Sequence, residues 1–203
     1  EMLLGGGWRA MSCEQFNSVA RSTRIWYARI PLTPFLWVEG RHIYADGRAS
    51  MLVKIGPVKI VDASGPGISS ADMVTCFNDR SIFLPASLVL PDVSWRESGP
   101  EGTAAAFSNG GYEAEAALSF GKDGLLADFV TGSRARLDGA AFRSAVWSTP
   151  ITAWRSRGGL REAVAGSARY LESGRAEPYL RFDDPAMELE YGAEALAAAR
   201  RCR

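Results

Sequence analysis

The single histidine of this chain, His42, is the side chain best suited to act as a general acid or base near neutral pH. A serine or cysteine nucleophile needs a nearby base, usually histidine, and a further group that orients the base. His42 lies in the strand-like segment 40–44, and no G-x-S-x-G turn is present to expose a serine. A lone histidine on a strand is typically a half-buried hydrogen-bonding residue. We therefore predict no catalytic residues and a protein that is not an enzyme.

Metal and cofactor sites are not predicted either. Cys13, Cys76 and Cys202 are far apart, whereas zinc sites use close pairs of Cys or His. Asp183–Asp184 precedes a proline, which favours a turn over a calcium site. Gly5–Gly7 precedes a strand and so lacks the strand–loop–helix setting of a phosphate-binding loop. A carboxylate-dependent hydrolase stays an alternative, because spacing alone does not show which acids face each other across a cleft.

Aromatic residues are the remaining candidates for a binding role. The chain contains six Trp, six Tyr and nine Phe, several of them near the ends of expected strands. Aromatic side chains on alternating strands usually belong to the core. The alternative is that they line an apolar pocket, as in the mouth of a β-barrel.

Length and composition indicate a globular protein. We expect one domain over residues 1–203, with 1–7 as a flexible leader and 193–203 as a C-terminal helix or tail. Lys+Arg and Asp+Glu number 23 each, so no net charge favours nucleic acid as a partner. The sequence holds no apolar run long enough for an integral membrane helix. The chain as given is expected to be cytoplasmic, or periplasmic or membrane-associated if an upstream segment has been removed.

Strand patterns dominate the chain. Alternating apolar and polar residues over 112–120, flanked by Asn109-Gly110 and Gly121–Gly124, predict the middle strand of a three-stranded meander over 103–131. The segments 25–32, 35–44, 50–55 and 58–61 show similar patterns. Further strands are expected at 145–157, 160–164, 168–172, 179–182 and 187–191.

Two short helices are expected to interrupt these strands. Ser69 to Asp72 fits a capping box, followed by an apolar stripe that includes Met73 and Phe77. Pro85 suits the first turn of a second helix carrying Leu88. The predicted fold class is mainly β (α+β). It consists of a strongly curved antiparallel sheet or half-barrel, with two or three short helices covering one face.

An ordered series of short motifs resembles an uncharacterised bacterial domain family. It runs from Trp8–Met11 through Ile25–Ile30, Gly40–Tyr44, Phe83–Leu88, Val93–Trp95 and Phe120–Gly124 to Val146–Pro150. That family more often has an acid at the position of His42, and its members tend to carry an additional upstream segment, as expected if this chain is a short form. The strand–helix order is similar to the half-barrel of bacterial lipoprotein carriers of the LolA and LppX type. This resemblance implies a space for acyl chains between sheet and helices, by analogy of fold alone.

The leading hypothesis is a non-enzymatic protein that binds a lipid or other hydrophobic small molecule in such a cavity. The residues expected to line the cavity or to serve as its polar anchor are Trp26, Ile30, Trp37, Met73, Phe77, Leu88, Arg41 and Arg134. One alternative is a structural or protein-interaction domain with a dry core. The other is the carboxylate-dependent hydrolase.

Overall fold

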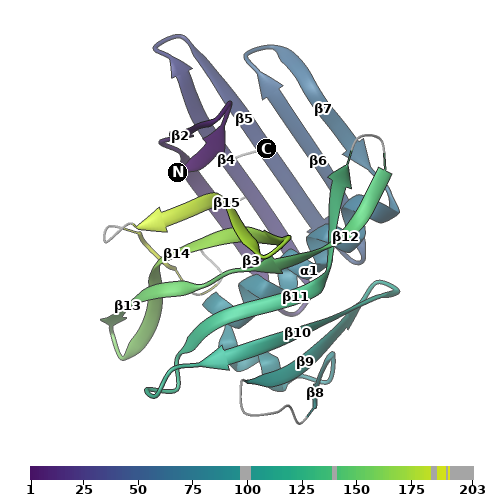
Figure 1. Cartoon of the computed structure of the whole chain (residues 1–203), viewed down its shortest axis with the longest axis vertical. Helices are drawn as coiled ribbons and strands as arrows, with labels where there is room; N and C mark the ends of the chain where they lie inside the picture. The colour runs from purple at the N-terminus through teal and green to yellow at the C-terminus, as the bar shows by residue number, and fades with distance from the viewer. Residues whose placement is uncertain (97–101, 139–140, 184–186, 191, 193–203) are drawn as a thin grey trace.

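The computed structural model describes residues 1–96, 102–138, 141–183, 187–190 and 192. These residues form two open antiparallel sheets and one α-helix, α1 (Pro66–Phe83). Figure 1 shows the two sheets crossing, with α1 at the place where they meet. The fold is therefore mainly antiparallel β, as predicted.

The smaller sheet, sheet B, is a five-stranded meander. Its order is β3 (Ser12–Ser18), β4 (Thr23–Thr33), β5 (Leu36–Ala45), β6 (Arg48–Ile55) and β7 (Val58–Ser64). Side chains alternate between its two faces, and Arg24, Trp26, Ala28 and Ile30 share the inner face that looks toward α1 and the other sheet.

The larger sheet, sheet A, contains ten strands. Its central meander joins β9 (Thr103–Asn109), β10 (Tyr112–Phe120) and β11 (Leu126–Asp138), with β8 (Val93–Arg96) at one edge. The other strands are β12 (Ala141–Ser148), β13 (Ile151–Arg157), β14 (Leu160–Glu172), β15 (Arg175–Asp183), β1 (Met2–Leu4) and β2 (Gly7–Arg9). In β10 the buried residues Ala114, Ala116 and Leu118 alternate with exposed Glu113 and Glu115, which confirms the predicted meander.

Helix α1 connects the sheets and packs against both. Its side chains Met73, Val74 and Phe77 are fully buried in the core. The Phe77 ring stacks on Phe107 and meets Phe129 edge-on, with centroids 5.3 and 5.2 Å apart. Aromatic side chains of β9 and β11 thus occupy the space between α1 and sheet A.

Helix α1 begins earlier than predicted, and its first turn lacks the predicted side-chain cap. It begins at Pro66 after Gly65, which has φ 115°, and no side chain caps it. The Ser69 hydroxyl accepts a hydrogen bond from the Ala49 amide instead, so the predicted capping box is wrong. The second predicted helix is a 3-10 turn, η1 (Pro85–Val89), and no further helix occurs among the described residues.

Several predictions about strands also change, and the two strands expected at 160–164 and 168–172 form the single strand β14. Residues 1–7, expected as a flexible leader, contain β1, and Met2 pairs with Leu180 of β15. The single strand expected over 145–157 is divided into β12 and β13 around Thr149-Pro150. Residues 187–190 form no strand, and the predicted terminal helix at 193–203 lies outside the described residues.

Candidate functional site

The residues predicted to line a cavity beneath the helix do not lie together. Met73, Phe77 and Leu88 belong to the main core, where their exposed fractions are 0%, 0% and 5%. Trp26 and Ile30 lie on the inner face of sheet B. Trp37 and Arg41 lie on its outer face, since they alternate with the inner-face residues of β5.

A shallow pocket of about 540 Å³, widely open to solvent, is present at the outer face of sheet B, at the end near the β4–β5 turn. Its residues come from three segments: the connection that enters β3, strand β4 with its turn, and the start of β5. The lining consists of Ala10, Met11, Ser12, Arg29, Pro31, Thr33, Pro34 and Trp37. Of the predicted residues, only Trp37 contributes to this pocket.

The Trp37 indole is held in place from two sides. The Arg29 guanidinium carbon lies 3.6 Å from the centre of the indole ring, which is a cation–π contact. The indole Nε1 donates to Glu39 Oε1 at 3.0 Å, and the Tyr27 hydroxyl donates to the same oxygen at 2.9 Å. The pocket therefore combines a fixed aromatic wall with a guanidinium.

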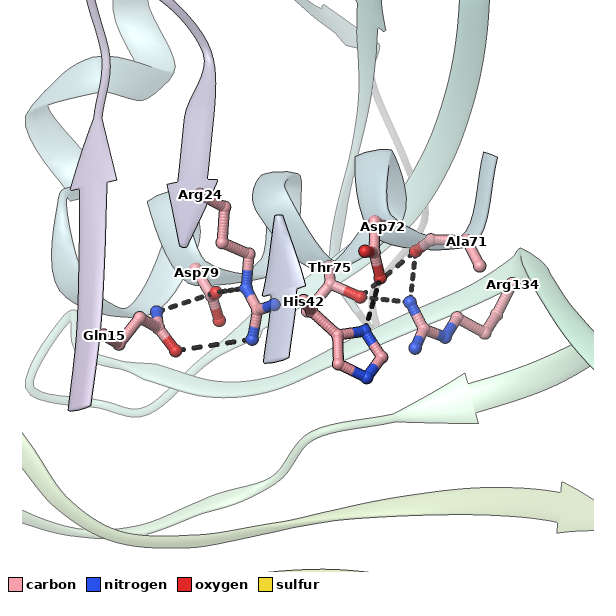
Figure 2. A network of polar contacts seen from close by, with 8 residues as sticks. All are labelled: Gln15, Arg24, His42, Ala71, Asp72, Thr75, Asp79 and Arg134. Carbon is pink, nitrogen blue, oxygen red and sulfur yellow. Dashed lines mark hydrogen bonds and ion pairs between the residues drawn. The ribbon is translucent and has the colours of Figure 1, made fainter. Parts of the chain in front are cut away.

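A second group of polar and charged side chains contacts α1 on the side that faces the sheets (Figure 2). Asp79 accepts hydrogen bonds from Arg24 Nε at 2.5 Å and from Gln15 Nε2 at 2.8 Å. Arg24 and Asp79 are both buried, at 7% and 6% exposed. The ion pair joins the helix to β4, and the hydrogen bond from Gln15 joins it to β3.

One end of the same network joins the helix to both sheets. His42 Nδ1 lies 3.3 Å from Asp72 Oδ1, and Arg134 of β11 donates to the Ala71 carbonyl and the Thr75 hydroxyl. Figure 2 shows His42 and Arg134 approaching the same stretch of α1. Arg134 also lies over the Trp147 ring, 4.8 Å from its centre. Arg134, predicted as a polar anchor for a ligand, is thus bonded to the helix.

The electrostatics of this network agree with a structural role. Burial alone would raise the pKa of Asp72, but the hydrogen bond and charge of His42, with Arg24 and Arg134 nearby, lower it overall. The ionised carboxylate keeps a hydrogen-bond acceptor facing His42 Nδ1. Among the described residues no Ser, Thr or Cys side chain is hydrogen-bonded to His42, so the arrangement of a catalytic nucleophile and its base is not formed. We interpret the network as a clamp between α1 and the two sheets.

Sequence reasoning missed both groups for different reasons. Asp72 and Asp79 are seven residues apart, which places them on one helix face, and this spacing was a usable signal. Arg29 and Met11 meet only through the pairing of β3 with β4, where Ser12 faces Arg29. The described residues contain no group of three or more His, Cys, Asp or Glu side chains placed to hold a metal ion.

The comparisons with known proteins give a family but no function. The chain matches the Family of unknown function (DUF6544) over residues 2–182, and it therefore belongs to that family. Neither a curated protein nor a solved structure matches it. In the described part of the chain no helix has the length and apolar character needed to cross a membrane.

Proposed function

We propose that this member of a family without an assigned function binds a small amphipathic molecule, with one apolar chain and an anionic group. The observation that carries the proposal is the pocket at the outer face of sheet B. Its volume, about 540 Å³, falls within the roughly 300–1,000 Å³ of small-molecule sites. The proposed ligand class is the one expected from the sequence, at a different place in the fold.

The apolar part of the ligand would lie against Met11, Pro31, Pro34 and Trp37. Pro31 near the end of β4 and Pro34 in the β4–β5 turn restrict the backbone on this side, and the Trp37 ring is held by Arg29 and Glu39. Such a wall loses little conformational freedom when a ligand binds, which favours affinity. A flexible methionine on the other side adapts to the shape of an alkyl chain.

The anionic group would pair with Arg29. A guanidinium binds a carboxylate through two parallel hydrogen bonds. No carboxylate forms an ion pair with Arg29 in the described structure, although other arginines such as Arg24, Arg80 and Arg136 are paired. Arg29 is exposed at the pocket and stacks on the Trp37 ring, which supports its proposed role as the partner of the anionic group.

Calorimetric titration with dodecanoate tests the proposal. We expect saturable binding by the wild-type chain and at least a tenfold loss of affinity in Trp37→Ala. Arg29→Gln should weaken binding of dodecanoate while leaving the uncharged dodecanol almost unaffected. Matched controls are Trp95→Ala, on a partly exposed tryptophan of β8, and Arg48→Gln, on an exposed arginine of β6. Equal affinity in wild type and Trp37→Ala would refute the site.

The alternatives have less support from the contacts. Asp72 and Asp79 are engaged by His42 and Arg24, so these two buried acids are not a free pair for hydrolysis. A dry core between α1 and sheet A suits an interaction domain equally well, but it leaves the outer pocket without a role.

A further inference from the structure

Two hairpin turns of sheet B end beside each other, beyond the body of the molecule. The β4–β5 turn covers residues 33–36 and the β6–β7 turn covers 55–58; together we call them the hairpin tips. The Gly56 amide donates to the Trp37 carbonyl at 3.2 Å, which joins the two turns. Figure 1 shows both at the upper end of sheet B, away from sheet A.

The hairpin tips carry an unusual concentration of exposed apolar side chains. Phe35 is 89% exposed, and Val58 and Ile60, at the start of β7, are 57% and 55% exposed. Leu36 is 37% exposed, and Pro34 and Pro57 are also at the surface. Single exposed apolar residues need no explanation, but a group at the end of two adjacent hairpins does.

Basic side chains are in slight excess next to the tips. Arg29, Lys54 and Lys59 lie on the strands that lead into the two turns. Glu39 is the cross-strand neighbour of both Arg29 and Lys54, and Asp62 forms an ion pair with Lys59. The tips therefore present apolar side chains with a small local excess of positive charge, although the whole chain has balanced charge.

We propose that the hairpin tips bind the surface of a lipid bilayer that contains anionic lipids. Apolar side chains on projecting turns can enter the region between headgroups and acyl chains, while nearby Lys and Arg contact the headgroups. Trp37, at the base of the first turn, has the amphipathic ring that favours this interface. Projecting turns suit insertion, whereas a protein partner is more often met by a flat or concave patch.

This inference goes beyond the proposed ligand and does not depend on it. Phe35 and Val58 are outside the pocket lining, so the two proposals respond to different substitutions. If both are correct, binding to a bilayer places the pocket next to the membrane, because Thr33 and Pro34 belong to one of the tips.

Co-sedimentation of the full chain with vesicles tests the inference. With vesicles of phosphatidylcholine and phosphatidylglycerol we expect binding that weakens at high salt and is poor on phosphatidylcholine alone. Phe35→Ser and Val58→Ser should each lower vesicle binding about tenfold or more, since an inserted apolar side chain is lost. Val89→Ser is the matched control, because Val89 is 83% exposed on η1, outside the tips.

Two further measurements make the result decisive. Circular dichroism verifies folding of each variant, and both tip variants should still bind dodecanoate as the wild type does. Failure of the wild type to sediment with anionic vesicles would overturn the inference, as would equal losses in Val89→Ser. Concentration-dependent self-association that Phe35→Ser abolishes, without vesicle binding, would assign the tips to a second copy of the chain instead.

Discussion

Charged residues in the interior of this protein are compensated by specific partners. Arg24 and Asp79 pair at 2.5 Å between sheet B and α1, with less than a tenth of each side chain exposed. Glu162 is fully buried and receives hydrogen bonds from Arg155 and Arg157. Removing one partner of such a set leaves a buried charge without compensation, which costs more than the set contributes.

The first prediction concerns the Arg24–Asp79 pair. Arg24→Met should lower the free energy of unfolding by about 3–5 kcal/mol, because Asp79 would stay buried without its cation. Lys59→Met is the control: the Lys59–Asp62 pair is exposed to solvent, so its loss should change the free energy of unfolding far less than the loss of Arg24. Urea denaturation of both variants measures the difference. Similar losses in the two would contradict the assignment of a buried clamp.

The second prediction concerns pH. Hydrogen bonds from Arg157 and Arg155 lower the pKa of Glu162 below its ordinary value of 4.5. Its contribution to stability is therefore complete above about pH 4.5 and is lost as the pH falls through the lower folded value. Glu162→Gln should cost about 2 kcal/mol at neutral pH. The difference in unfolding free energy between Glu162→Gln and wild type should narrow as the pH falls below 4.5, and a difference that stays constant in urea titrations would oppose this explanation.

Two turns, one from each sheet, add a direct contact between the sheets to those made through α1. The β5–β6 turn at Gly47 meets the β9–β10 turn at Gly110, and the Tyr44 hydroxyl donates to Asn109 at 2.5 Å. A Cβ atom on Gly110 would lie 2.0 Å from the Gly47 Cα. Both glycines are in the left-handed region, with φ 78° and 60°.

The third prediction compares neighbouring glycines in one turn. Gly110→Ala should lower the free energy of unfolding by about 2 kcal/mol more than Gly111→Ala. Both residues have positive φ, but a Cβ on Gly111 meets no atom within 4 Å. The two alanine variants therefore have similar backbone strain, and only the Cβ at position 110 would collide with Gly47 of the other sheet. Equal melting temperatures for the two variants would mean that the turns do not need to touch.

Local elements were predictable where short-range patterns decide them. The alternation in β10 and its glycine turns require no distant information, and the meander was found. The start of α1 at Pro66 was not, because Ser69 bonds to Ala49 of β6 rather than to its own helix. The pairing of β1 with β15 joins the first and the last strand of the described chain, which are so far apart in sequence that no local pattern indicates it.

The predicted site and the observed pocket lie on opposite sides of sheet B. Its inner face packs toward α1 and sheet A, whereas the pocket is on its outer face. Trp26 and Trp37 lie on neighbouring strands and were expected together, yet they occupy opposite faces of sheet B. Sequence alone did not show which face meets α1. Arg29 and Trp37 meet through the pairing of β4 with β5, whereas Met11 and Ser12 join them only after β3 pairs with β4, so the complete pocket required the tertiary structure.

A crystal structure of the chain with dodecanoate tests most directly whether the outer pocket of sheet B binds an amphipathic anion. We predict an alkyl chain along Trp37, Pro31 and Met11, with the carboxylate at the Arg29 guanidinium. Density for the ligand between α1 and sheet A, or an empty pocket at saturating dodecanoate, would contradict the claim.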